Sequence, residues 1–245
     1  NGYTGQLLAR AAAQRGLRPI LAGRNRQTIS ALANELNLPF RCFDLNRPQQ
    51  ICEGLQDIQV VLHCAGPFSA TSGPMIDACL AAGCHYLDIT GEIDVFVAAQ
   101  QRQADAEQAG IVLCPGVGFD VIPTDCIAAR LKLALHDADR LAPGFDTHSS
   151  LSPGTARTSV EGLKYGGRVR KDDRIQTVPL AYQSREIDFG NGTKHAVTIP
   201  WGDIATAWFT TGIDDIEVFI PMAPSAAARL RRLDRFRALL GLAPV

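Results

Sequence analysis

The chain has 245 residues, of which 46% are hydrophobic and 20% are charged, and its formal net charge at pH 7 is −1. This length allows one or two domains with a buried core, and the balanced charge favours neither nucleic acid nor an acidic polymer as a partner. No apolar run approaches the roughly 18 residues that a membrane-spanning helix requires.

Cysteine and histidine spacing gives no sign of a disulfide framework or a metal site. The seven cysteines lack CxxC spacing, and the five histidines lack HExxH or another ligand spacing. An odd number of cysteines without paired spacing is typical of reduced thiols. We therefore predict buried thiols, no structural metal and a cytoplasmic location.

The first five residues predict a phosphate-binding turn. Gly2 and Gly5 form a GxxG pattern around Tyr3 and Thr4, directly before an apolar helical stretch. In a nucleotide-binding turn, one glycine lets the backbone approach the phosphates, another lets the helix pack on its strand, and the helix N-terminus binds the anion. Glycine pairs are also common at ordinary helix starts. The strand that should precede this turn, with its own glycine, is missing from the chain.

The end of the second expected strand predicts which cofactor binds. The apolar run over residues 17–22 ends at Gly23, and Arg24 follows about 20 residues after the glycine turn. An acidic residue at this position binds the ribose of NAD, whereas an arginine matches the 2′-phosphate of NADP. We therefore predict NADP, with Arg24 and Asn25 beside it. The alternatives are that Arg24 is a solvated loop residue and that Asn25 caps the next helix.

The first half of the chain alternates between helix and strand patterns, which predicts a parallel sheet covered on both faces. Its near-continuous apolar strands agree with burial on both sides. We expect helices over residues 4–14, 26–36, 48–55, 74–82, 95–109 and 121–135, and strands over residues 19–22, 39–43, 58–63, 85–89 and 111–114.

Residues that follow the strands are candidates for cofactor contact, because ligands bind beyond the carboxyl ends of parallel strands. Asp44 could accept a hydrogen bond from the adenine amino group, or could be an ordinary turn aspartate. The small residues Ala65 and Gly66 would let the backbone lie against the ribose and nicotinamide, and Pro67 and Phe68 would line the pocket. The same segment could be a plain tight turn.

Four side chains near the ends of the next two strands are candidates for catalysis: Tyr86, Asp88, Glu92 and Asp120. Reduction of an unsaturated carbon needs a proton donor as well as a hydride, and each of these groups can carry a proton. Asp120 could instead cap the following helix, and Glu92 could complement a helix dipole. The solvent or a substrate group could also supply the proton.

Together these motifs resemble the saccharopine dehydrogenase-like oxidoreductases, and most closely the branch that contains the trans-acting enoyl reductases. The resemblance rests on five segments in order, at residues 1–5, 21–25, 65–68, 77–92 and 118–125, and extends less distinctively through residues 152–155. It implies a Rossmann-type, doubly wound α/β domain that binds NADP, a second α+β domain and a two-electron reduction. We expect the chain to be a fragment that lacks the first strand and a C-terminal portion. Saccharopine itself is not the expected substrate, since its binding residues are not recognisable.

We place the NADP-binding domain at residues 1–120 and an incomplete α+β domain, for substrate binding or dimerisation, at residues 121–245. In the second half, Asn191-Gly192 predicts a hairpin between residues 185–189 and 194–199, and Thr158 and Glu161 suggest a capping box. Candidates for a pocket here, each also explicable as packing, are Tyr165, His195, Trp201 and Asp203.

The expected function is NADPH-dependent reduction of an unsaturated or carbonyl group in a small or lipid-like substrate. The alternative is a non-catalytic dinucleotide-binding scaffold that attaches to a membrane or a partner. Residues 229–237 suggest this alternative, because they form a basic amphipathic helix that could lie on an anionic membrane; most such helices instead cover a core. A homodimer is also compatible with the sequence.

Overall fold

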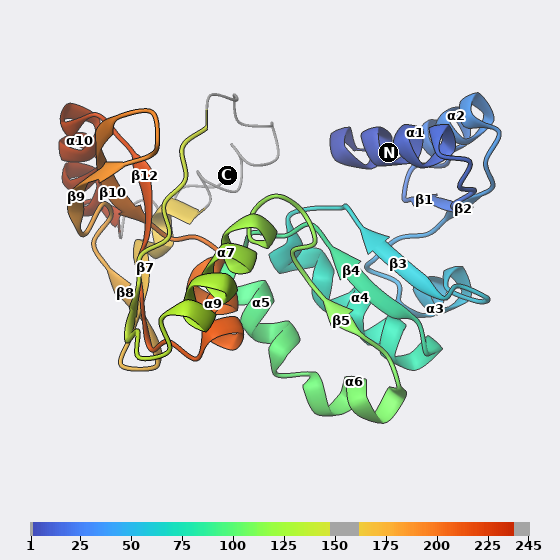
Figure 1. Cartoon of the computed structure of the whole chain (residues 1–245). Helices are drawn as coiled ribbons and strands as arrows, with labels where there is room; N and C mark the ends of the chain where they lie inside the picture. The colour runs from blue at the N-terminus through green and yellow to red at the C-terminus, as the bar shows by residue number, and fades with distance from the viewer. Residues whose placement is uncertain (1, 148–161, 238–245) are drawn as a thin grey trace. The chain divides into compact units, whose positions relative to one another are not determined.

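The computed structural model describes residues 2–147 and 162–237 (Figure 1). Within these ranges the chain forms two compact units, one of residues 1–90 with 97–117 and the other of residues 91–96 with 118–245. The capping box expected at Thr158 and the likeness at residues 152–155 lie outside the described residues. No helix in the described ranges is long and apolar enough to cross a membrane.

The first unit is the expected alternation of helices and parallel strands. In chain order its elements are α1 (Tyr3–Gln14), β1 (Leu21–Gly23), α2 (Arg26–Leu36), β2 (Phe40–Cys42), α3 (Pro48–Gly54), β3 (Val60–His63), α4 (Phe68–Ala82), β4 (His85–Asp88), α5 (Ile93–Gln100), α6 (Gln103–Ala109) and β5 (Leu113–Cys114). Helix α5 begins in the second unit and ends in the first.

Its strands form two separate parallel sheets, as Figure 1 shows. β1 pairs with β2, and β3, β4 and β5 form the other sheet in that order. Each sheet has its own core, the first around Ile29 and the second around Tyr86. On β3, Val60 and Leu62 are 50% and 43% exposed. A complete Rossmann sheet has a strand between these two halves, and no described strand of the first unit takes that place.

The second unit contains two further sheets and three α-helices among its described residues. Its elements are α7 (Ile122–Ala134), β6 (Arg140–Leu141), the 3-10 helix η1 (Leu163–Tyr165), β7 (Gly167–Lys171), β8 (Arg174–Val178), β9 (Ser184–Asp188), β10 (Thr193–Ile199), α9 (Asp203–Thr211), β11 (Asp215–Ile216), β12 (Val218–Pro221) and α10 (Pro224–Asp234). The strand orders are β6-β11-β7-β8 and β12-β10-β9. The predicted hairpin is confirmed, with Thr193 opposite Asp188.

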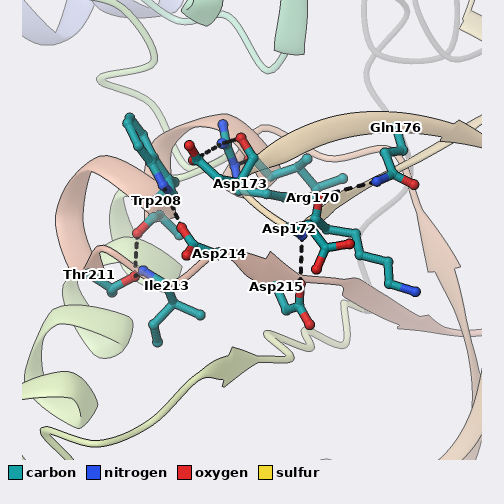
Figure 2. A network of polar contacts seen from close by, with 12 residues as sticks. Arg170, Asp172, Asp173, Gln176, Trp208, Thr211, Ile213, Asp214 and Asp215 are labelled. Atoms are coloured by element: carbon teal, nitrogen blue, oxygen red, sulfur yellow. Dashed lines mark hydrogen bonds and ion pairs between the residues drawn. The ribbon is translucent and has the colours of Figure 1, made fainter.

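A polar network fixes α9 to the β7–β8 hairpin (Figure 2). The buried guanidinium of Arg170 donates from Nε to the Ile204 carbonyl oxygen at 2.9 Å and from Nη1 to the Asp173 carbonyl oxygen at 3.0 Å. It also lies over the Trp208 ring, 4.8 Å from the centroid, and Trp208 Nε1 donates to Asp214 Oδ1 at 3.2 Å. The network satisfies a buried cation with carbonyl oxygens and an aromatic face.

Several expected boundaries are wrong, and local interactions explain them. Helix α4 begins at Phe68, six residues before the expected start at Pro74, because Pro74 is accommodated inside the helix. The helix expected over residues 95–109 is broken into α5 and α6 near Arg102, which instead binds Asp77 and Asp105. The basic helix α10 begins at Pro224 and ends at Asp234, so residues 235–237 lie beyond it.

The cysteines are free thiols, but most are not buried as expected. Cys79 and Cys84 lie in the core of the first unit, and burial raises their pKa values. Cys42, Cys52, Cys114 and Cys126 are exposed, because the short strands and helices that carry them leave their side chains outside the two cores.

Candidate functional site

The glycine turn has the geometry of an anion-binding helix start. Helix α1 begins directly after Gly2, whose φ of −74° and ψ of 175° are extended, and no side chain caps it. A Cβ at Gly2 would meet no atom within 4 Å, whereas a Cβ at Gly5 would lie 3.8 Å from Cys64 Cβ. The first glycine therefore has open space around it, and the second packs near Cys64, the residue that follows β3.

Arg24 follows β1 as an exposed side chain. Within the described part of the chain, its guanidinium has neither a hydrogen-bond nor an ion-pair partner. The neighbouring Asn25 caps α2, since its side chain accepts a hydrogen bond of 3.1 Å from the Thr28 amide. Arg26 lies over the Phe40 ring, 5.8 Å from its centroid. Arg24 is thus free to bind an anion, while Asn25 also has the structural role given as its alternative.

Asp44 forms a turn after β2. Its Oδ1 accepts hydrogen bonds from the Asn46 amide at 2.9 Å and from Asn46 Nδ2 at 3.0 Å. This is the turn role that the sequence left open beside the adenine contact.

The loop after β3 is held by hydrogen bonds to Thr71, a residue that the sequence analysis missed. Thr71 Oγ1 donates to the Ala65 carbonyl oxygen at 2.5 Å, lies 3.0 Å from the Pro67 carbonyl oxygen, and is also 3.0 Å from His63 Nε2. Ala65 and Gly66 are exposed above it, whereas Phe68 is buried. The sequence does contain a signal for this role: Thr71 follows Pro67 by four residues, near the start of α4. A threonine hydroxyl at such a position can donate to carbonyl oxygens of the preceding loop.

Phe68 and His63 belong to the packing beneath this loop. Their rings meet edge to face, 5.6 Å between centroids. Burial lowers the pKa of His63 to about 4, because the charged imidazolium form would lose its hydration inside the protein. A neutral histidine therefore supports the loop.

Tyr86 and Asp88, two of the four catalytic candidates, are fully buried at the end of β4. The Tyr86 hydroxyl donates to Asp88 Oδ2 at 2.6 Å, and Asp88 Oδ1 accepts from the Thr90 amide at 2.9 Å and from the Gly116 amide at 2.8 Å. Burial raises the pKa of Tyr86, and the charge of Asp88 raises it further. The pair thus ties together the loops that follow β4 and β5.

Glu92 and Asp120, the other two candidates, belong to the second unit. The Glu92 carbonyl oxygen accepts from the Val95 amide at 3.0 Å in the first turn of α5. Asp120 does not cap α7: the cap is Val121, without a side-chain hydrogen bond. The Asp120 carboxylate instead lies over Gly91, where a Cβ would come within 2.8 Å of Oδ2, and burial raises the pKa of Asp120.

The remaining candidates of the second half have ordinary contacts, with one exception. Trp201 Nε1 donates to the Asp120 carbonyl oxygen at 2.6 Å, and His195 Nδ1 is 2.9 Å from the Met222 carbonyl oxygen. Tyr165 is exposed beneath Lys164. Asp203 is the exception, since both of its oxygens are buried without a hydrogen bond in the described ranges.

The basic helix α10 uses its apolar face inside the second unit. Ala227 and Leu230 pack against Ala181 and Val197, and Arg231 Nε donates to the Ala181 carbonyl oxygen at 2.8 Å. The face that a membrane would need is therefore largely occupied by the protein's own core.

Comparison with known proteins agrees with this geometry. Residues 1–114 match the family model of the saccharopine dehydrogenase NADP binding domain. A trans-acting enoyl reductase of Mycobacterium ulcerans is 34% identical over 138 residues, which cover 51% of this chain and 32% of that protein. The human saccharopine dehydrogenase-like oxidoreductase is 24% identical over 209 residues, or 74% of this chain and 49% of that protein.

Among solved structures, apo saccharopine dehydrogenase from Saccharomyces cerevisiae resembles the chain with a TM-score of 0.65 and 14% identity, over 98% of this chain and 57% of that one. The chain spans half or less of the length of the two relatives named above. The structural likeness shows a common Rossmann-type fold. The resemblance seen in the sequence is thereby confirmed: residues 1–114 match the NADP-binding domain of saccharopine dehydrogenase, and the chain is similar to trans-acting enoyl reductases and to saccharopine dehydrogenase-like oxidoreductases.

Proposed function

We propose that this protein is an NADPH-dependent oxidoreductase that reduces an unsaturated or carbonyl carbon of a small or lipid-like molecule. The observation that carries the proposal is Arg24, an exposed cation without a described partner at the carboxyl end of β1, in a domain of the NADP-binding family. A guanidinium is suited to the 2′-phosphate that distinguishes NADP from NAD.

The residues of the first unit fit such a cofactor. The uncapped start of α1 at Gly2, Tyr3, Thr4 and Gly5 would hold the diphosphate, because helix amides and the helix dipole bind anions. Arg24 would hold the 2′-phosphate, with Asn25 and Asp44 near the adenosine. The exposed backbone of Ala65 and Gly66, continued by Pro67 and Phe68, would lie against the nicotinamide ribose.

When bound, NADPH supplies a hydride, and the chain must supply or admit a proton. Among the four candidates we favour Asp120 as the donor, because it is only partly buried and its raised pKa keeps more of it protonated. Tyr86 and Asp88 are better suited to holding the loops, since each already satisfies the other. Glu92 is the remaining alternative.

The test is NADPH consumption over a panel of enones, ketones and imines. We expect turnover of at least one class, and a loss on the order of a hundredfold in kcat for Asp120→Asn, the usual effect of removing a general acid. Glu92→Gln separates the two candidates: it should keep most of the rate if Asp120 is the donor, whereas a larger loss than in Asp120→Asn would assign the proton to Glu92. NADPH binding without turnover of any compound would favour the non-catalytic scaffold instead.

A further inference from the structure

Two aspartates on neighbouring helices of the second unit have carboxylate oxygens that are buried without hydrogen bonds. Asp203 is the first residue of α9 and is 0% exposed, and Asp125 lies in the first turn of α7. In the described part of the structure, no partner is found for either oxygen of Asp203 or for Oδ1 of Asp125. An ionised carboxylate is costly in such a place, because burial removes its hydration and nothing replaces it.

The two aspartates are brought together by the packing of α7 on α9. Asp203 and Thr210 lie seven residues apart, on one face of α9. Thr210 Oγ1 donates to Asp125 Oδ2, although the contact is long at 3.4 Å. Thr124 of α7 approaches Asp203 in the same way, but its hydroxyl donates to the Val121 carbonyl oxygen at 3.0 Å. Thr124 of α7 thus lies near the carboxylate of Asp203, and Thr210 of α9 lies near the carboxylate of Asp125. Neither hydroxyl compensates the neighbouring carboxylate more than weakly.

The helix amides do not compensate Asp203 either. A carboxylate in the first turn of a helix usually accepts hydrogen bonds from free amides there. In α9 these amides are already used: Ile204 donates to the Trp201 carbonyl oxygen at 3.1 Å, and Ala205 donates to the Gly202 carbonyl oxygen at 2.8 Å. The Thr124 hydroxyl and the amide of Asp203 itself lower the pKa of Asp203, but burial outweighs both.

No cation on the elements that pack against α9 pairs with Asp203 or with Asp125 Oδ1 in the described ranges. On β7, Arg170 is bound to carbonyl oxygens, to Asp173 Oδ1 and to the Trp208 ring (Figure 2), and Arg168 pairs with Asp94. On α7, Lys132 donates to the Ala138 carbonyl oxygen at 2.8 Å. The remaining charged groups on these elements are Arg130 of α7, Lys171 of β7 and the acidic Asp215 of β11.

We propose that Asp203, with Asp125 nearby on α7, is a proton-binding site that holds a proton at neutral pH. A fully buried carboxylate without a cation or a hydrogen bond is costly when ionised, and the negative charge of a second carboxylate nearby raises that cost. Burial, helped by the charges of Asp125 and Asp120, raises the pKa of Asp203 to about 7. Burial raises the pKa of Asp125 as well.

A role for this proton site in catalysis rests on the proposed function. Each reduction consumes one proton, and the charge of Asp120 acts on Asp203. Asp203 in its protonated form would return a proton to Asp120 after each turnover.

The direct test is the titration of aspartate carboxyl groups by carbon-13 NMR, from about pH 4 to pH 9, with no substrate present. In the wild type we expect one carboxyl resonance that titrates well above the ordinary aspartate range. It should be lost in Asp203→Asn and shifted toward the ordinary range in Asp125→Asn. Asp139→Asn, which changes an exposed aspartate of the same unit, should leave it in place.

Stability provides a second readout. A raised pKa means that the folded state holds a proton that the unfolded state has lost, so the contribution of Asp203 to the stability of the second unit should fall as pH rises from about 4 to about 7. This trend is opposite to the one expected from His63 in the first unit, so the comparison is between the wild type and Asp203→Asn at each pH. Asp203→Asn should fold and should lose this decline. Ordinary titration of every aspartate, or an unchanged decline in Asp203→Asn, would overturn the proposed proton site.

The role in reduction is separable from the site itself. Asp203→Asn should keep NADPH affinity and should move the upper limb of the pH profile of kcat to lower pH. An unchanged profile would show that the proton site does not feed the reaction. If no compound is turned over, the proposed function fails while the titration still decides whether the site exists.

Discussion

The hydroxyl of Tyr86 donates a 2.6 Å hydrogen bond to Oδ2 of Asp88, and both side chains are fully buried at the end of β4. Through Oδ1, Asp88 also accepts from the Thr90 and Gly116 amides. One carboxylate therefore links a strand to two loops that leave the same edge of the sheet.

We predict that Asp88→Ala destabilises the first unit strongly. It leaves the Thr90 and Gly116 amides and the Tyr86 hydroxyl without their acceptor, and each unsatisfied buried donor costs about 1–3 kcal/mol. Asp88→Asn should cost less, because its carbonyl oxygen can still accept from the amides. Urea unfolding measures both. Tyr165→Phe, at an exposed tyrosine, is the control; a loss as small in Asp88→Ala as in this control would contradict the account.

Two glycine substitutions should change stability in opposite directions. A Cβ at Gly202 would come within 2.6 Å of Val121 Cγ1 and 2.7 Å of Phe96 Cε2, so Gly202→Ala should cost about 1–3 kcal/mol through overpacking. Gly73 lies inside α4 with nothing within 4 Å of a Cβ. Gly73→Ala should therefore stabilise by up to about 1 kcal/mol, the difference in helix propensity. Thermal unfolding of both variants tests the pair; equal signs would count against this packing.

Local signals explain why much of the fold was predictable in both units. Asn25 marks the start of α2 as an N-cap, and the Asn191-Gly192 turn marks the hairpin of β9 and β10, because both signals act within a few residues. The start of α4 was missed, since its first turns contain Ser69, Thr71 and Pro74, which favour loops when no tertiary contact is known.

The candidate site was predictable in its outer parts and not in its interior. The glycine turn and Arg24 follow from spacing along the chain. The burial of Asp88 does not, because an aspartate near the end of a strand is most often exposed, and one of the amides that compensates it, that of Gly116, lies 28 residues further along the chain. The electrostatic effect of Asp125 on Asp203 depends on the packing of α7 on α9, two helices about 80 residues apart, which no local pattern encodes.

Acid should destabilise the first unit through His63. Its pKa falls to about 4 in the folded state, compared with about 6.5 when unfolded, so the unfolded state binds the extra proton in this window. Stability should therefore decrease as pH falls from about 6.5 to about 4, by on the order of 3 kcal/mol. His63→Gln should remove this limb of the profile, while His136→Gln, at an exposed histidine, should keep it. A limb that persists in His63→Gln would assign the effect to another group.

The central claim is that Arg24 binds the 2′-phosphate of NADP, and fluorescence titration of the protein with NADPH and NADH tests it most directly. For Arg24→Ala we predict a loss of NADPH affinity of about tenfold or more, since a hydrogen bond to a charged group contributes about 1.5–3 kcal/mol, with NADH affinity nearly unchanged. Arg15→Ala, at the opposite end of α1, should alter neither affinity. Equal losses for both cofactors, or no loss of NADPH affinity, would contradict the account.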